Sequence, residues 1–124
     1  MKDFTYSVLS VLLATLALGF AAKTAMAEDL LAVMPDDVKV IVDNDRVRVL
    51  DVLHKPGVKE PMHSHPDYVA VYLSDTRVRV TTPDGKIVEK DRKAGSAAWS
   101  GPTTHALENI GTGDQHVIVI ELKK

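Results

Sequence analysis

Apolar and polar residues alternate with a period of two over most of the chain after Val38. Successive side chains of a β-strand point to opposite faces of a sheet, so this alternation is typical of strands with one buried face. Turn residues interrupt the pattern at Pro56 and Gly57 and again at residues 83–85. The strands that the pattern predicts are residues 38–42, 46–53, 60–65, 68–73, 76–81, 86–90, 97–100, 104–110 and 116–122.

The number and spacing of these strands restrict the fold class. About nine short strands, with a turn roughly every 8 to 12 residues, predict an all-β sandwich or barrel. No stretch of useful length has the period of an amphipathic helix. The chain has 124 residues, which suits one domain, and a single closed barrel accommodates so many strands better than two packed domains.

Residues 1–27 have the features of a secretory signal peptide. Lys2 precedes a mainly apolar run, residues 8–22, whose length of about 15 is short of the roughly 20 residues that a membrane-spanning helix needs. Residues 25–27, Ala-Met-Ala, then form a small-x-small cleavage pattern. We expect cleavage after Ala27 and export, in bacterial style, to the periplasm, with no stable membrane anchor afterwards. The alternative is an uncleaved anchor.

The mature chain then divides into two parts. Residues 28–37 form an N-terminal arm with an apolar patch that Pro35 ends, which suits a short helix. Residues 38–124 hold all the expected strands and form the barrel domain.

Composition excludes several kinds of chemistry. The chain has 15 Lys and Arg residues against 17 Asp and Glu residues, a net charge of −2, so a nucleic acid or an anionic membrane is not the expected partner. Cysteine is absent, which excludes disulfides, thiolate metal ligands and a cysteine nucleophile. A metal ion would therefore be bound by histidine, carboxylate, amide or water.

Three of the five histidines form a candidate metal site. His63 and His65 are two residues apart on one predicted strand, so both imidazoles point to the same face. His105 begins a later strand. Neutral imidazole is a good ligand for divalent transition metals, and three protein ligands leave coordination positions open for water or substrate.

The residues around these histidines resemble the two motifs of the cupin family, small jelly-roll barrels with a metal ion in the mouth. Gly57 precedes His63 by the family's spacing of five residues, and His65 completes its His-x-His pair. His105 and Asn109 have the family's second spacing, His-x3-Asn. The resemblance covers residues 47–122. It implies a single jelly-roll barrel in which His63, His65 and His105 hold a divalent ion of Fe, Zn, Mn, Ni or Cu.

The chain departs from the family where cupins place a glutamate ligand. Val69 stands four residues after the second histidine and Ala70 five residues after it, and neither supplies an oxygen. The resemblance then implies either a centre of three histidines or weak metal binding. Asp67 is a possible substitute ligand. We place Val69 on the inner face beside the imidazoles, with Val71, so that a coordination position stays open.

The same alternation assigns the remaining side chains. Tyr68 and Tyr72 would face outward, into a possible homodimer contact, while Glu60 and Glu108 would lie off the histidine face. No catalytic acid or base is therefore nominated. The expected cavity wall is apolar and favours a small, weakly polar ligand; it consists of Val69, Val71, Trp99, Leu107, Ile118 and Ile120.

Further polar residues receive structural roles. His54 is expected at the surface or rim, and Trp99 is expected to pack at the barrel end. We expect His116 in the core or supporting a metal ligand, with a role as a fourth ligand as the alternative, and Asn109 orienting a ligand through its amide.

Two classes of function fit these expectations. The first is an exported, metal-dependent enzyme with oxygenase-like or Lewis-acid chemistry on a small organic molecule. The second is a non-catalytic barrel that binds a small ligand or has a structural role. The missing carboxylate favours the second class, and the three histidines favour the first. Fold by itself does not decide between them.

Overall fold

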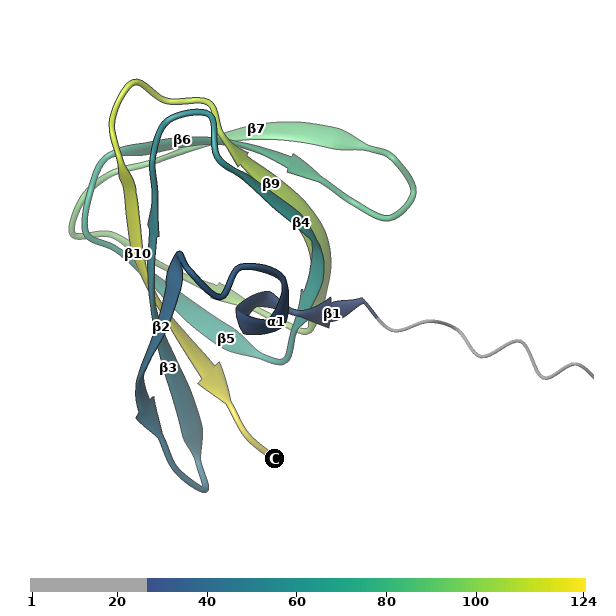
Figure 1. The fold of residues 1–124 in the computed structure, drawn as a ribbon, viewed down its shortest axis with the longest axis vertical. Helices are drawn as coiled ribbons and strands as arrows, with labels where there is room; N and C mark the ends of the chain where they lie inside the picture. Colours follow the sequence, from purple (N-terminus) through teal and green to yellow (C-terminus); the bar gives the residue numbers. More distant parts are fainter. Residues whose placement is uncertain (1–26) are drawn as a thin grey trace, which may run out of the picture.

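The computed structural model describes residues 27–124 (Figure 1). The predicted signal peptide, apart from Ala27, lies outside the described residues. The elements are β1 (Glu28–Asp29), α1 (Leu30–Val33), β2 (Val38–Asp43), β3 (Val47–His54), β4 (Lys59–His65), β5 (Tyr68–Tyr72), β6 (Thr76–Thr81), β7 (Ile87–Arg92), β8 (Ala97–Ser100), β9 (Thr103–Asn109) and β10 (Gln115–Leu122).

The strand pattern read from the sequence agrees closely with these bounds. Strands β6 and β8 begin and end where the alternation predicted, and the other seven predicted strands differ by at most two residues at either end. The structure adds β1, which pairs in parallel with β4. The expectation of an all-β chain is confirmed.

The strands form two five-stranded sheets that face each other. Their orders are β1-β4-β9-β6-β7 and β2-β3-β10-β5-β8. Figure 1 shows β4 and β9 on one side of the interior and β3 and β10 on the other, with α1 between them. Except for β1, every paired strand is antiparallel, and neighbours in a sheet are often distant in sequence, as in a jelly roll.

Alternate residues of the strands fill the interior. In β10, Val117 and Val119 are buried while their neighbours are half-exposed, and β3 contributes Leu50 and Val52 to the same core. Leu30 of α1, 2% exposed, closes this core, so the N-terminal segment packs against the barrel. The Asp29 side chain accepts a hydrogen bond of 2.8 Å from the Leu31 amide and caps the short helix.

The inward and outward faces of β5 are opposite to those we expected. Ala70 is buried and pairs with buried Val119 of β10, while Tyr68 and Tyr72 line the interior cavities. Val69 and Val71 therefore lie on the outer face. The apolar pair Ile118 and Ile120, which faces them across the β5–β10 ladder, lies there too. The mistake arises because every residue of β5 is apolar or aromatic, so alternation alone does not say which set is buried.

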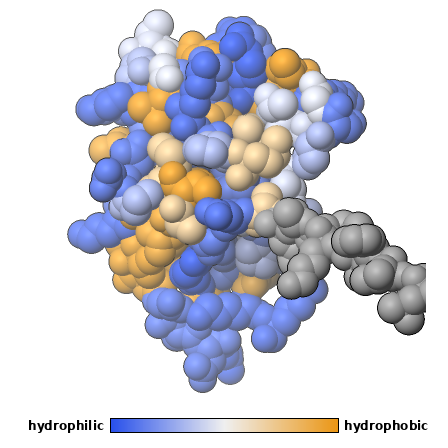
Figure 2. Space-filling view, turned by 45° about the vertical axis from the view of Figure 1, so that its right-hand side comes forward, coloured by the Kyte–Doolittle hydropathy of each residue, from blue (hydrophilic) through white to orange (hydrophobic). Residues whose placement is uncertain are grey.

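The outer face of the second sheet is rich in apolar side chains. Trp99 is 62% exposed and Leu53 is 42% exposed, and Trp99 pairs with Val69 in the ladder. Figure 2 shows a face of the molecule that is largely hydrophilic, with apolar side chains gathered at its lower left. Among residues 27–124, no helix has both the length and the apolar character needed to cross a membrane.

Candidate metal centre

The structure brings His63, His65 and His105 together inside the barrel. His63 and His65 lie on β4, and the ladder between β4 and β9 places His105 directly opposite His63. The side-chain nitrogens that could bind an ion lie within 4.8 Å of one another, and all three residues are buried. Among the described residues, this is the one group of histidines and carboxylates with such geometry.

Hydrogen bonds at the far side of two rings fix which nitrogen faces the centre. Nδ1 of His63 donates to the Pro61 carbonyl oxygen over 2.7 Å, which leaves Nε2 with a free lone pair. Nδ1 of His65 faces a carboxylate oxygen of Glu121 at 3.4 Å. The two Nε2 atoms then lie 3.0 Å apart. Both imidazoles therefore present Nε2 to one point, with the opposite nitrogen anchored, as in protein metal sites.

The protonation of the rings suits metal binding. Burial lowers the pKa of His105 to about 4, and its neighbours His63 and His65 contribute to the shift. Burial also lowers the pKa of His63, although the charge of Glu60 opposes this effect. Neutral imidazole is the form that binds a metal ion, so these two rings are ready to act as ligands near neutral pH.

The spacing of the nitrogens fits a single ion. Two nitrogens bound at about 2.0–2.1 Å to one ion lie roughly 2.9–3.4 Å apart when they are adjacent ligands. The 3.0 Å between Nε2 of His63 and Nε2 of His65 falls in this range. Without an ion, the same distance fits a hydrogen bond in which one Nε2 carries the proton, and an ion would replace that bond. The three-histidine cluster can therefore hold a divalent transition metal.

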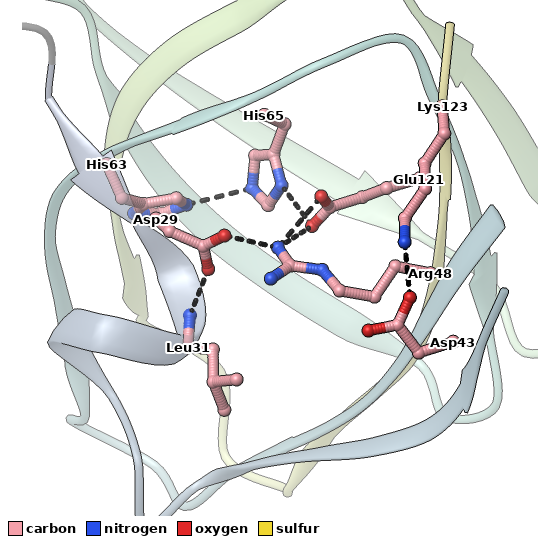
Figure 3. Close-up of polar contacts among 8 residues, drawn as sticks. All are labelled: Asp29, Leu31, Asp43, Arg48, His63, His65, Glu121 and Lys123. Carbon is pink, nitrogen blue, oxygen red and sulfur yellow. Dashed lines mark hydrogen bonds and ion pairs between the residues drawn. The ribbon is translucent and has the colours of Figure 1, made fainter. Parts of the chain in front are cut away.

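A chain of charged groups supports His65 from behind (Figure 3). The guanidinium of Arg48 donates to both oxygens of Glu121, at 3.0 and 2.9 Å, and pairs with Asp29 at 2.5 Å. Glu121 is 4% exposed and faces Nδ1 of His65. Glu121 and Asp29 thus lie on either side of Arg48. Burial alone would lower the pKa of Arg48, but the hydrogen bonds and charges of the two carboxylates outweigh burial and raise it. Sequence reasoning missed this support, because its residues lie on three separate strands.

Glu60 faces the interior, contrary to our expectation. The ladder between β4 and β9 changes register between Glu60 and His63, which is a β-bulge. An extra residue in one strand reverses the parity of everything beyond it, so Glu60 and His63 point to the same side although they are three residues apart. Glu60 is 5% exposed, and its Oε2 lies 3.3 Å from Nε2 of His63.

His54 is buried rather than at the rim. Its exposure is 0%, its Nε2 lies 2.6 Å from Oε1 of Glu60, and its Nδ1 lies 3.0 Å from Oδ2 of Asp37. Burial opposes a charge on this ring, but the hydrogen bonds to Glu60 and Asp37 outweigh it and raise the pKa of His54. An imidazolium donates from both nitrogens, so His54 joins the two carboxylates.

Two cavities adjoin the three-histidine cluster. The inner one, about 60 Å³, is lined by Glu60, His65, His105 and Gln115 among others. The outer one, about 270 Å³, opens to the surface and shares His105 with the inner one. Their common lining also includes Tyr68, Ala70, Tyr72, Val78 and Leu107.

The wall of the outer cavity differs from the apolar wall we expected. Leu107 and Trp99 take part, but the valines and isoleucines of β5 and β10 that we assigned to it lie on the outer sheet face. Two cations of β7, Lys90 and Arg92, also line this cavity, together with Thr82, Ser100 and Thr103. The cavity therefore suits a more polar ligand than the sequence suggested.

Three other candidate residues lie outside the centre. His116 is on the outer face of β10, where its Nε2 contacts Asp51 at 2.7 Å, rather than in the core. Asp67 lies in the bend before β5 and is not part of the three-histidine cluster. Asn109 is 1% exposed, but its amide binds the carbonyls of His54 and Gly113, so it fixes the loops rather than a ligand.

Comparison with solved structures gives the fold's relatives. A cupin domain from Bordetella pertussis Tohama I is 27% identical, with a TM-score of 0.66, and the match covers 70% of this chain and 92% of that one. An RmlC-like cupin with a double-stranded β-helix fold from Methanocaldococcus jannaschii is 16% identical, with a TM-score of 0.57 over 69% of this chain and 78% of that one. No protein-family model and no curated protein matches the chain.

The architecture and the buried histidines define a cupin-type jelly roll. The chain folds as a cupin domain, and the resemblance read from the spacing of His63, His65 and His105 is confirmed. Enzymes share this fold: an oxalate decarboxylase, 22% identical with a TM-score of 0.53, matches over 69% of this chain and 25% of its own length.

Proposed function

We propose that the protein is an exported metalloenzyme that binds one divalent transition metal through His63, His65 and His105. The observation that carries this proposal is the 3.0 Å separation of the two β4 Nε2 atoms, with both Nδ1 atoms anchored elsewhere. Fe, Zn, Mn, Ni and Cu all accept imidazole ligands. Bound there, the ion would supply Lewis-acid chemistry or oxygen activation at a coordination position that the three histidines leave open.

The outer cavity indicates the class of small molecule. His105 forms part of its wall, so a ligand in this cavity reaches the metal centre. Arg92 donates to the Asp91 carbonyl and lies over the Tyr72 ring at 5.9 Å, and neither Lys90 nor Arg92 has an acidic partner among residues 27–124. Unpaired cations beside a buried metal favour an anionic group. We therefore propose a small organic carboxylate as the substrate.

A non-catalytic binding module is the second candidate, because the two carboxylates that contact the histidines, Glu60 and Glu121, are already paired with His54 and Arg48. The two candidates share the metal and the ligand and differ in turnover. Incubation of the metal-loaded protein with small carboxylates, oxalate among them, separates the two. Conversion of any of them that stops in His105→Ala supports the enzyme, and binding without conversion supports the module.

The metal proposal is tested by metal content and titration with Zn²⁺ of the protein purified without a histidine tag. Each of His63→Ala, His65→Ala and His105→Ala should lower affinity at least about tenfold. His116→Ala, on the outer face, is the matched control and should bind as the wild type does. Unchanged affinity in all three variants would refute the metal centre.

Export and cleavage after Ala27 remain part of the proposal. Support comes from the Ala-Met-Ala pattern and from Glu28, the next residue, which begins β1 beside His63. A mature chain starting at Glu28 thus keeps every described element. Mass spectrometry of the periplasmic fraction should find Glu28 at the N-terminus, and a chain that retains Met1 in the membrane fraction would contradict export.

We also propose a homodimer, through the outer face of the second sheet. Val69, Val71, Ile118 and Ile120 lie in adjacent ladder positions there, and exposed Trp99 extends this apolar surface. A second copy offers the same apolar surface, which a two-fold interface pairs with itself. Sedimentation should show a dimer that Ile120→Glu dissociates; a monomeric wild type would refute it.

A further inference from the structure

We propose that Glu60 is a fourth protein ligand of the metal centre, and that His54 and Asp37 hold its carboxylate in position. This inference rests on the proposed metal centre. The cupin resemblance assigned no role to Glu60, and alternation placed it on the wrong face. The β-bulge between Glu60 and His63 brings it inside.

The position of the Glu60 carboxylate points to the centre. Oε2 lies 3.3 Å from Nε2 of His63, the nitrogen that faces the cluster. The same carboxylate lines the inner cavity together with His65 and His105. Glu60 therefore contacts one imidazole of the cluster directly and shares the lining of the inner cavity with the other two.

The contact between Glu60 and His63 needs a cation. Nδ1 of His63 carries the proton that binds the Pro61 carbonyl, so Nε2 of the neutral ring offers only a lone pair. Oε2 of Glu60 also offers only lone pairs. Two electron-pair donors at 3.3 Å repel each other unless a proton on Nε2 or a metal ion lies between them. A metal ion bound to both atoms removes this repulsion.

The other oxygen of Glu60 is held from behind. Oε1 accepts from Nε2 of His54 over 2.6 Å, and Nδ1 of His54 contacts Asp37 over 3.0 Å. This leaves Oε2 as the oxygen free to bind an ion. Carboxylates that bind metals are commonly hydrogen-bonded in this way, which fixes their orientation.

The space around Glu60 suits this role. Ala70 of β5 also lines the inner cavity. A methyl group there leaves room for the Glu60 carboxylate to approach the three-histidine cluster. Oε1 of Gln115, which lines the same cavity, has no hydrogen-bond partner among the described residues. The inner cavity thus has polar lining from both Glu60 and Gln115.

The energetics of burial favour the same conclusion. Two carboxylates against one imidazolium leave a negative charge beside the cavity, and a buried charge is costly unless it is compensated. A divalent ion supplies that compensation. Asp37, with its side chain 32% exposed, loses less solvation than Glu60 at 4%. Glu60 is therefore the carboxylate that solvent stabilises least.

The test is titration of the whole mature chain with Zn²⁺ and with Co²⁺, whose visible spectrum reports the ligand set. Glu60→Gln keeps the size and a hydrogen-bonding oxygen but removes the charge. We expect Zn²⁺ affinity to fall at least about tenfold and the Co²⁺ spectrum to change. Glu108→Gln is the control, because Glu108 pairs with Arg79 away from the centre at 3.3 Å. It should match the wild type in both measurements.

The outcomes separate this inference from the proposed centre. Wild-type affinity and an unchanged Co²⁺ spectrum in Glu60→Gln, with metal binding lost in His63→Ala, would overturn the role of Glu60 and leave the three-histidine centre intact. Wild-type affinity in His63→Ala would overturn both. If Glu60→Gln alone fails to fold, the double variant with His54→Gln removes the paired charges together. It should show the same loss, and wild-type affinity in it would also overturn the inference.

Discussion

Arg48 holds Glu121 through two hydrogen bonds, of 3.0 and 2.9 Å, and so fixes the carboxylate that faces Nδ1 of His65 at 3.4 Å. Arg48 comes from β3 and Glu121 from β10, which pair in the ladder at these positions. Asp29 of β1 completes the chain by pairing with Arg48 (Figure 3). The ring of His65 is therefore oriented by groups from three strands, none of them next to it in sequence.

This support predicts an effect on metal binding without loss of a ligand. Glu121→Gln should lower Zn²⁺ affinity by about 10- to 100-fold, because Nδ1 of His65 loses a charged acceptor and the ring loses basicity. Arg48→Gln should act in the same direction. Arg79→Gln, which removes an exposed arginine paired with Glu89, is the control. Wild-type affinity in Glu121→Gln would show that His65 needs no such support.

The orientation of β5 predicts different effects at two adjacent positions. In the Glu60→Gln background, Ala70→Glu should restore Zn²⁺ affinity, because residue 70 lines the inner cavity and can return a carboxylate to it. Val69→Glu in the same background should not, because residue 69 lies on the outer sheet face. Rescue by Val69→Glu instead would mean that β5 faces the other way.

The histidines of the cluster predict how the metal-free protein responds to acid. The pKa of His105 is lowered to about 4 by burial, from an ordinary value near 6.5, and that of His63 is lowered too. Between the pKa of these rings in the folded protein and the ordinary value of 6.5, the unfolded chain binds more protons than the folded one. The stability that His105 and His63 contribute is therefore full above pH 6.5 and falls towards pH 4. The pKa of His54 is raised, so the stability that this ring contributes is full below about pH 6.5 and is lost only as the pH rises above that value.

Chemical denaturation of the chelator-treated protein from pH 7 to pH 4.5 checks this prediction. His105 alone should contribute up to about 1.4 kcal/mol per pH unit to the slope of the unfolding free energy. His105→Gln should flatten the profile by that amount. An equally steep profile in His105→Gln would assign the acid sensitivity to other groups.

The different burial of two leucines of β3 predicts different losses of stability on substitution. Leu50 is 0% exposed and Leu53 is 42% exposed, so the same substitution should have different costs. Leu50→Ala should lower the free energy of unfolding by about 2–5 kcal/mol, through lost burial and the cavity it leaves. Leu53→Ala should cost well under about 1.5 kcal/mol if the chain is monomeric under the conditions used. Similar losses from thermal or urea unfolding would contradict this placement of the core.

Much of the fold could be predicted from local patterns. The alternation in segments such as residues 76–81 and 97–100 identified strands with their bounds, because one buried face imposes a period of two. The spacing of His63, His65 and His105 indicated a cluster, and the structure brings the three rings together. These predictions held because each depends on neighbours in sequence or on a spacing that the family shares.

The surroundings of the cluster could not be predicted in this way. Alternation put Glu60 outside and His54 at the surface, because no residue pattern announced the bulge after Glu60. It also reversed β5, where Tyr68 and Val69 are both apolar enough to be buried. A shift of one residue turns every side chain to the other face, so such errors are complete rather than gradual.

The sequence by itself determined the strands, the turns between them and the histidine spacing, since these follow from side-chain periodicity and from turn residues over a few positions. Only the tertiary structure decided which face of β5 is buried, that Glu60 meets His63, and that Arg48 and Glu121 stand behind His65. These depend on ladder register, on one bulge and on pairing between strands distant in the chain. Register is set by the packing of whole sheets, which no local segment encodes.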